Sequence, residues 1–396
     1  MDRREFRRTR RFALDSALGL MERTWVSLRG GPRWRLRSRS GDAVTIGHQV
    51  WPTMQTQLDL GADQNAVLAA FTTATNDSSS IILKSLTAAA PQMLRDHRSL
   101  QRGFSRRLRA THGEALDMMF AVYVAATEHG AGLQQLNNDS SSYGLGALLG
   151  LHARACLVLA EVHSLLAGGL PMGAFARARS LHETAVVASL LSVRGAQPES
   201  QDLGERFTIY GVIDEWKDIS RAIDENVALD ADYVDEIRAA RAEAIARFGK
   251  EFAGDYGWAR TLFPDLAEKA RVTFSMVEEA SFRASSRLDY RMASHHVHTS
   301  ARTIALNTVL WRGRAVRLTG PTNIRFDHPA EIALRSMIVC SEALAFGQPT
   351  PDPMDFVIVE TLTRMCEEAI ELFDEAADCV SERENSAGAV DRSRAR

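Results

Sequence analysis

Residues 145–167 read LGALLGLHARACLVLAEVHSLLA, and residues 173–193 read GAFARARSLHETAVVASLLSV. Apolar residues recur in both stretches at intervals of three and four positions, which is the period of an α-helix. Both stretches end at residues that break helices: Gly168, Gly169 and Pro171 after the first, and Gly195 and Pro198 after the second. Because the link between them is short, the sequence predicts an antiparallel helical hairpin in the middle of the chain.

The same period recurs along most of the chain from about residue 60. Further helices are expected over 63–75, 79–95, 97–111, 113–132, 202–224, 231–250, 265–306, 329–346 and 354–382. The polar run 137–142 is expected to be a loop, and the stretch 308–318, centred on Gly313, is the strand candidate, as a small hairpin. The fold class is therefore all-α: a multi-helix bundle with an Arg-rich N-terminal arm and at most one small β-hairpin.

Four regions are expected along the chain. They are a basic N-terminal arm (1–46), an N-terminal helical region (47–136), a central helical domain that carries the candidate site (137–318), and C-terminal helices with a charged tail (319–396). Residues 1–46 hold 12 Arg and 5 acidic residues, whereas residues 352–396 hold 5 Arg and 12 acidic residues. A basic arm can follow a phosphate backbone. The chain has 43 Arg but only 4 Lys, which points to codon usage as the simpler source of arginine.

Composition narrows the class of protein further. The chain is 45% hydrophobic and 24% charged, which is typical of a globular protein. It has no uninterrupted apolar run of about 18 residues, so we expect no transmembrane helix, no membrane partner and a cytoplasmic location. The four cysteines form no CxxC pair, and motifs for phosphate loops, dinucleotides, zinc proteases and serine hydrolases are missing from the sequence. No cofactor and no metal are expected.

The densest polar feature is the run from Arg287 to His298. At about 100° per residue, one side of a helix there would carry Arg287, Arg291, Ser294, His295 and His298. Imidazole titrates near neutral pH and moves protons, and guanidinium stabilises phosphate charge. An Arg and His stripe of this kind is a candidate catalytic surface, although a single His is more often structural.

A second polar feature lies inside the 173–193 helix, where Arg179 and Glu183 are spaced to form an ion pair within one helix. Its flanking residues are apolar, so charges there need partners. The preceding helix supplies Glu161, and the two helices and the Arg287–His298 run are expected to meet in one polar cluster. That convergence is a hypothesis about packing.

Two mechanisms fit such a cluster. In the first, His298 or His295 is the general base or acid for a ribose 2′-hydroxyl while Arg291 and Arg287 stabilise the phosphate, so RNA is cleaved without a metal. In the second, Glu161, Glu183 and two of His182, His295 and His298 bind a metal inside the bundle. The second is weaker, because Arg179 beside the carboxylates would oppose a dication.

The residues from about 105 to 300 resemble a bacterial family of helical proteins that is defined only as a domain of unknown function. The resemblance rests on Glu161 before a Leu-Leu-x-Gly-Gly loop, the run Ala-Arg-Ser-Leu-His-Glu at 178–183, and the spacing of Tyr290, Ser294 and His298. It implies a helical architecture and marks as signature positions Glu161, Arg179, Glu183, Tyr290, Ser294 and His298. It implies no activity.

A second resemblance concerns activity. Four residues separate Arg291 from His296 and six separate it from His298, which is similar to the Arg-x(4 to 6)-His motif of HEPN-type ribonucleases in defence and toxin systems. Met292 follows the Arg where that family often has a polar residue, so the sequence leaves open whether the chain is an enzyme. The leading prediction is a HEPN-like protein with RNA as partner, a catalytic set of Arg291, His298, His295, Glu183 and Arg179, and a substrate-binding set of Arg287, Tyr290, Ser294 and Glu161.

The alternative is a non-enzymatic helical module that recognises an anionic ligand or a protein partner. HEPN-type sites commonly form across a homodimer, so both the ribonuclease and the non-enzymatic module raise the question of a dimer interface. The apolar face of the 354–382 helix is the candidate. That face could be a dimer interface, but we expect it to be core within one chain; it consists of Phe356, Val359, Leu362, Met365, Ile370 and Phe373.

Overall fold

The computed structural model describes residues 64–138, 140–267, 269–281, 301–311 and 314–394. The chain divides into two units, Met1–Arg102 and Gly103–Arg396, and each is treated by itself. The described part of the first unit is the beginning of helix α3 (Gln64–Leu136). Residues 1–46, which were expected to form the basic arm, lie outside the described residues.

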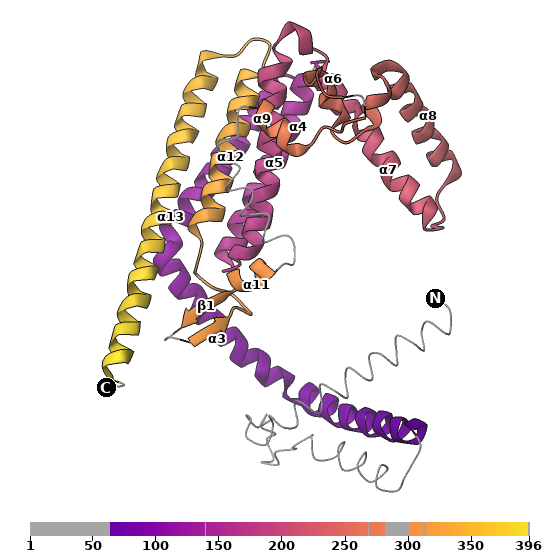
Figure 1. Ribbon diagram of the computed structural model, residues 1–396. Helices are drawn as coiled ribbons and strands as arrows, with labels where there is room; N and C mark the ends of the chain where they lie inside the picture. Colours follow the sequence, from indigo (N-terminus) through magenta and orange to yellow (C-terminus); the bar gives the residue numbers. More distant parts are fainter. Residues whose placement is uncertain (1–63, 139, 268, 282–300, 312–313, 395–396) are drawn as a thin grey trace. The chain divides into compact units, whose positions relative to one another are not determined.

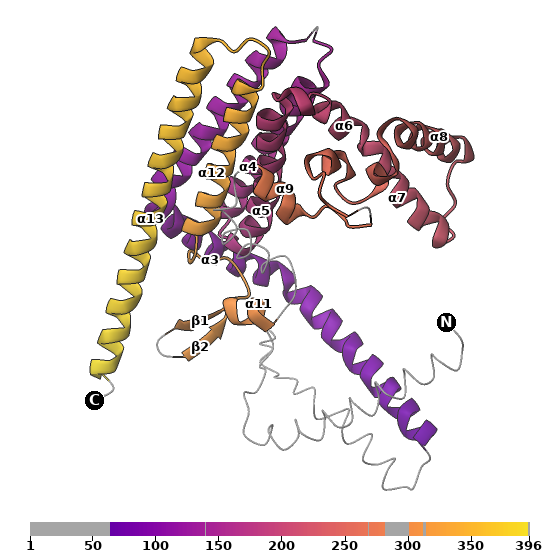
Figure 2. The same cartoon turned by 45° about the horizontal axis from the view of Figure 1, so that its top comes forward.

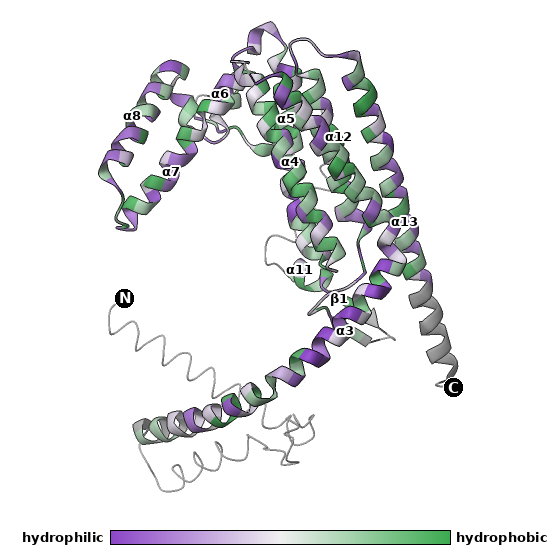
Figure 3. Cartoon of the chain, turned by 180° about the vertical axis from the view of Figure 1, so that it is seen from behind, coloured by the Kyte–Doolittle hydropathy of each residue, from purple (hydrophilic) through white to green (hydrophobic). Residues whose placement is uncertain are grey.

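The second unit is built around a bundle of long helices (Figures 1 and 2). The later part of α3 is joined there by α4 (Tyr143–Ala167), α5 (Pro171–Gly195), α12 (Asp327–Phe346) and α13 (Pro353–Arg394). One hydrophobic core takes buried side chains from all five helices, among them Met119, Leu159, Leu181, Leu334 and Phe373. Figure 3 shows the apolar character of α4, α5 and α12. The predicted all-α bundle is confirmed.

The α4–α5 hairpin forms as the sequence predicts. Ser142 caps α4, because its side chain accepts a hydrogen bond from the backbone N–H of Leu145. The turn after α4 needs a left-handed residue, which Gly169 supplies at a φ of 77°. Its carbonyl also accepts a hydrogen bond of 2.8 Å from the N–H of Thr322, which ties the turn to the segment before α12. Pro171 begins α5, where a missing N–H costs nothing.

Helix α12 packs against α4, α5 and α13. On α13 the residues Val359, Leu362, Ile370 and Phe373 are at most 7% exposed and Met365 is half-buried, whereas Phe356 is 48% exposed. The apolar face of α13 is therefore mostly core within the chain, as expected. Cys156, Cys340 and Cys366 are buried as well.

Smaller elements lie between α5 and α12 in the sequence. They are η1 (Pro198–Ser200), α6 (Leu203–Ile209), α7 (Gly211–Asp224), α8 (Ala231–Phe248), η2 (Lys250–Ala253), η3 (Gly257–Leu262), α9 (Phe274–Ala280), α11 (Ala301–Leu306), β1 (Thr308–Trp311) and β2 (Arg314–Arg317). Helices α7 and α8 pack on each other around Ile219, Val234 and Ile237. Strands β1 and β2 pair antiparallel, with Thr308 opposite Arg317, so the predicted hairpin is confirmed.

Several expected helix boundaries are wrong, for different physical reasons. The ranges 63–75, 79–95, 97–111 and 113–132 form the single helix α3, which continues through Pro91. The Ser79 and Ser80 hydroxyls donate to the carbonyl of Asn76, so these residues bond inside the helix instead of ending it. The range 202–224 is divided at Tyr210 into α6 and α7.

The helix expected over 265–306 does not begin at 265. Arg260 donates to the carbonyls of Phe263 and Leu266, which holds a turn there, and α9 begins only at Phe274. At the other end of the chain, α13 continues to Arg394, beyond the expected end at 382. The stretch from 383 to 394 has no proline that would end the helix.

Helix α4 is long and apolar enough to span a membrane by length and composition. A core helix of a soluble protein passes the same test. Nine α4 residues are buried inside the structure, including Leu159 and Val162, and the helix packs against α5 and α12. These contacts are compatible with a soluble protein.

Candidate functional site

Helix α5 carries a polar pair on a largely buried helix. The Arg179 Nε donates to the Glu183 Oε1 at 3.1 Å, one helical turn away. The Arg179 side chain is 19% exposed and that of Glu183 is 40% exposed. The intrahelical pairing expected from their spacing is confirmed, and its partial burial sets it apart from an ordinary surface pair.

Glu161 of α4 has a different partner from the one expected. It forms an ion pair with Arg177 of α5, and both side chains are about one-third exposed, at 40% and 35%. Arg177 and Arg179 are two positions apart, so they point about 200° apart around the helix. The Glu161–Arg177 pair therefore lies on another side of α5 from Arg179 and Glu183. Arg177 is not among the residues predicted from the sequence, because its pairing depends on how α4 and α5 pack.

A third pair on α5 is almost fully buried. His182 Nε2 lies 2.9 Å from Glu278 Oε1 of α9, and the two side chains are 8% and 3% exposed. The rings of His182 and Phe274 meet in a T-shaped arrangement, with centroids 6.5 Å apart. Glu278 is not among the residues predicted from the sequence. The sequence signal that could have found it is an acidic residue directly after Val277, because a carboxylate buried with its apolar neighbours needs a partner.

Backbone contacts hold the end of α9 on α5 as well. Ser189 donates to the carbonyl of Ser281 at 3.3 Å, and Arg194 donates to the carbonyl of Ala280 at 3.4 Å. Ser281 itself is only 2% exposed. The described segment that contains α9 therefore ends, at Ser281, on the side of α5 that carries His182.

The remaining sequence candidates lie outside the described residues. They are Arg287, Tyr290, Arg291, Ser294, His295 and His298. Arg287 is six residues after Ser281, and six residues of extended chain span at most about 20 Å. Whether these side chains join Arg179 and Glu183 stays a prediction.

Carboxylates in the described part of the site are already matched by cations. Glu161 pairs with Arg177 and Glu183 with Arg179. Within the described ranges, no three His, Cys, Asp or Glu side chains gather closely enough to hold a metal ion. An arginine beside Glu161 and another beside Glu183 would repel a dication at either carboxylate.

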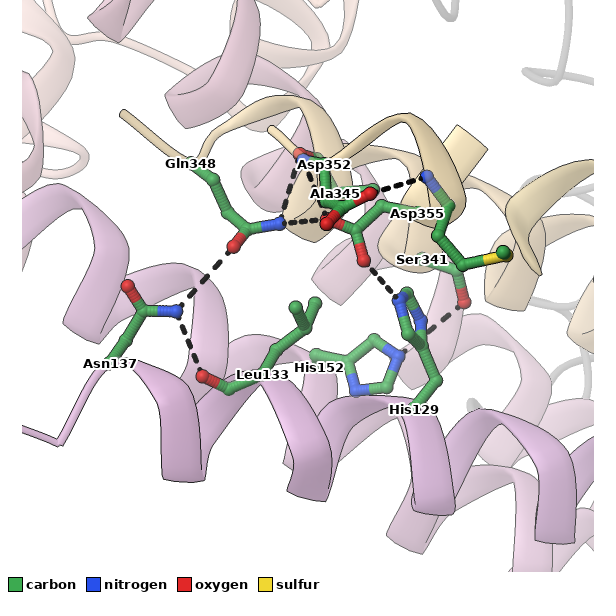
Figure 4. A network of polar contacts seen from close by, with 10 residues as sticks. His129, Leu133, Asn137, His152, Ser341, Ala345, Gln348, Asp352 and Asp355 are labelled. Atoms are coloured by element: carbon green, nitrogen blue, oxygen red, sulfur yellow. Dashed lines mark hydrogen bonds and ion pairs between the residues drawn. The ribbon is translucent and has the colours of Figure 1, made fainter. Parts of the chain in front are cut away.

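A separate polar network lies inside the bundle, and Figure 4 shows it. His129 Nε2 of α3 lies 3.3 Å from Asp355 Oδ1 of α13, with both side chains nearly buried. Gln348 donates to Asp355 Oδ2 at 2.8 Å, and His152 Nε2 of α4 lies 3.4 Å from the Ser341 hydroxyl of α12. This network was not predicted from the sequence, because the paired residues are 226 positions apart in His129–Asp355 and 189 apart in His152–Ser341.

Three histidines of the bundle have lowered pKa values. Burial, with a smaller contribution from His129, lowers the pKa of His152 from 6.5 to about 4. Burial also lowers the pKa of His112, which stacks on Phe326, and that of His163. Each of these groups resists protonation in the folded protein more than in the unfolded chain.

Acid should therefore destabilise the fold well above pH 4. Between pH 6.5 and 4 the unfolded chain protonates at His152 while the folded protein does not, so the stabilising effect of neutral His152 is complete above 6.5 and is lost as the pH falls. From His152 alone we expect a loss of about 2 kcal/mol in the free energy of unfolding at pH 5. Urea unfolding at pH 7.5 and pH 5 measures it.

The matched control is His328→Ala, since His328 is a 51% exposed side chain on α12. His152→Leu should reduce the proton uptake on unfolding between pH 6.5 and 4 by about one, and His328→Ala should not reduce it comparably. An equal pH dependence in the parent and His152→Leu proteins would contradict the assignment.

The fold and site define an all-α helix bundle whose central hairpin carries buried and half-buried acid–base pairs. Residues 145–311 match a family of unknown function (DUF5677). The match runs from α4 to β1, covers less than half of the chain, and includes Glu161, Arg179, Glu183, Tyr290, Ser294 and His298. No curated protein and no solved structure matches the chain.

Proposed function

We propose that the chain is an HEPN-like RNA-binding protein and a metal-independent endoribonuclease of a cytoplasmic defence or toxin system. The observation that supports this most directly is the attachment of α9 to α5. The His182–Glu278 pair and the Ser189 contact hold α9 and Ser281 on α5. His182 lies between Arg179 and Glu183 in the sequence, and Arg291 follows Ser281 by ten residues. The six residues between Arg291 and His298 fall within the Arg-x(4 to 6)-His spacing of the HEPN resemblance.

In the proposed reaction, His298 removes the proton of a ribose 2′-hydroxyl, and the 2′-oxygen attacks the adjacent phosphorus. The bond from phosphorus to the 5′-oxygen breaks, and His295 protonates that oxygen. The products are a 2′,3′-cyclic phosphate and a 5′-hydroxyl, so no metal and no redox partner enter the reaction.

The other candidate residues have supporting roles in this proposal. Arg291 stabilises the negative charge that builds up on the phosphate, and the Arg179–Glu183 pair orients the site. Arg287, Tyr290 and Ser294 bind the RNA backbone. Glu161 has no role in this proposal, because its carboxylate is paired with Arg177, which lies on another side of α5 from Arg179.

The test is a time course of RNA cleavage in excess EDTA, with the product ends mapped. We expect His298→Ala to cleave at least about 100-fold more slowly than the parent, which is the scale of lost general acid–base catalysis. His328→Ala, which removes an exposed histidine on α12, should cleave like the parent. Urea unfolding of each variant shows that it is folded.

Equal cleavage by the parent and His298→Ala would overturn the assignment of the histidine. No cleavage of structured or unstructured RNA at micromolar protein would overturn the nuclease. RNA that is bound but not cut would point to the non-enzymatic module, in which the same arginines recognise an anionic ligand.

A further inference from the structure

The outer side of α3 carries exposed arginines and an exposed aromatic residue within the second unit. Arg106, Arg109, Gly113, Asp117 and Phe120 are spaced by three and four positions, so they share one face of the helix. We define the α3–α4 patch as Arg106, Arg109, Asp117, Phe120 and Tyr123 of α3 with His163 of α4.

Phe120 is the aromatic centre of the α3–α4 patch. It is 47% exposed, although Met119 beside it is fully buried and anchors this part of α3 in the core. Its ring centroid lies 5.6 Å from that of Tyr123 and 5.2 Å from that of His163, with tilted planes. Neighbouring rings thus support an aromatic surface that faces solvent. An exposed ring held in this way is suited to stacking on a nucleobase.

The cations of the patch lie on the side of Phe120 toward the start of α3. From Gly103 to Gly113 the sequence has three arginines, Arg106, Arg107 and Arg109, and no acidic residue. All three are exposed. In the part of the chain that the structure describes, Arg106 and Arg107 form no ion pair, so their charge is available to a phosphate.

Arg109 extends the positive surface toward Phe120. Its side chain lies along the helix over Gly113, where a Cβ would come within 3.5 Å of the arginine stem. Its Nη2 then donates to both carboxylate oxygens of Asp117 at 2.8 Å. Asp117, which holds the guanidinium, lies three residues, or about 4.5 Å along the helix axis, before Phe120.

The Arg109–Asp117 pair can give way to a phosphate. Its side chains are 61% and 62% exposed, and exposed pairs contribute little to stability. Asp117 keeps the guanidinium in place when no ligand is bound, and a phosphate can accept the same two hydrogen bonds when it arrives.

We propose that the α3–α4 patch binds single-stranded RNA, with Phe120 stacking on a base and Arg109 and Arg106 holding successive phosphates. The inference deepens the proposed RNA-binding function and rests on it for the identity of the polymer. The patch is distinct from the residues proposed to cleave. A duplex buries the faces of its bases, so an unpaired strand fits the exposed ring better.

The test is fluorescence anisotropy of a labelled single-stranded RNA of 12 uridines, in EDTA, with the full chain carrying His298→Ala so that no RNA is consumed. We expect Phe120→Ala to weaken binding about tenfold and Phe120→Trp to retain it. Arg109→Ala should weaken binding severalfold. Asp117→Asn should tighten it, because it frees the guanidinium and removes a negative charge.

The matched control is Phe356→Ala. Phe356 of α13 is also about half exposed, at 48%, and its ring contacts that of Phe346, but no arginine stripe flanks it. It should leave the affinity unchanged. A hairpin RNA without a loop of uridines should bind more weakly than the single strand.

The outcomes separate this inference from the proposed nuclease. Weaker binding by Phe120→Ala, together with no cleavage by the parent, supports the patch and rejects the nuclease. Cleavage by the parent with equal affinities of the parent, Phe120→Ala and Arg109→Ala rejects the patch and leaves the nuclease standing. No binding of the single strand at micromolar protein, or weaker binding by Asp117→Asn, contradicts the proposal that the α3–α4 patch binds RNA.

Discussion

Replacing Gly204 by alanine is expected to lower the free energy of unfolding by about 3 kcal/mol, which is the upper end for overpacking. A Cβ on Gly204 of α6 would lie 2.4 Å from the Cα of Gly144 and 2.7 Å from its nitrogen in α4. Backbone cannot rotate aside as a side chain can, so α6 must move away from α4. Urea unfolding at neutral pH measures the loss.

Gly146→Ala is the matched control for Gly204→Ala. Gly146 lies in the first turn of the same α4 helix, and a Cβ there meets nothing within 4 Å. Alanine favours helix over glycine by up to about 1 kcal/mol, so this variant should unfold at equal or higher urea. Similar losses in both variants would show that glycine flexibility, and not close approach, matters at Gly204.

The contact between Gly144 and Gly204 matters because it positions the elements that follow α5. Helix α6 packs on both α4 and η3, and α7 follows it after Tyr210. The Tyr210 hydroxyl donates to the carbonyl of Gly254 at 2.6 Å and accepts from Lys217 at 2.9 Å, which joins α7 to the loop after η2. A shift of α6 would therefore reach the segment that leads to α9 and the candidate site.

The parts of the fold that the sequence predicts correctly depend on local signals. The α4–α5 hairpin follows from apolar periodicity and from the breakers Gly169 and Pro171, and the β-hairpin follows from its central Gly313. The continuity of α3 through Pro91 has no such signal. Pro91 ends a helix by local rules, yet α3 continues through it where the side chains are exposed, and the buried face of the helix begins only at Leu108.

The same distinction holds for the candidate site. The Arg179–Glu183 pair is four residues apart, so spacing alone predicts it. His182 and Glu278 are 96 positions apart, and the sequence around either residue does not indicate that the other is its partner. The partner of Glu161 required knowing which side of α5 faces α4. Pairing between elements follows packing, which periodicity does not specify for a bundle of this size.

Gly130→Ala tests a second close approach, inside the polar network of the bundle. A Cβ on Gly130 of α3 would lie 2.5 Å from His152 Nδ1 and 2.7 Å from its Cε1. His152 is 2% exposed and has the Ser341 hydroxyl at its other ring nitrogen, so the imidazole has little room to turn away. We expect a loss of about 3 kcal/mol in the free energy of unfolding, measured in urea at pH 7.5.

A double-mutant cycle identifies the cause of that loss. In a His152→Ala background the imidazole is gone, so Gly130→Ala should change from destabilising to neutral or to a gain of up to about 1 kcal/mol, the helix preference of alanine. If Gly130→Ala costs the same with and without the imidazole, the crowding is elsewhere. The expected loss of the destabilising effect would show that Gly130 is needed because the buried imidazole of His152 occupies the space beside it. Burial of the same imidazole lowers the pKa of His152, which is the cause of the predicted sensitivity of the fold to acid.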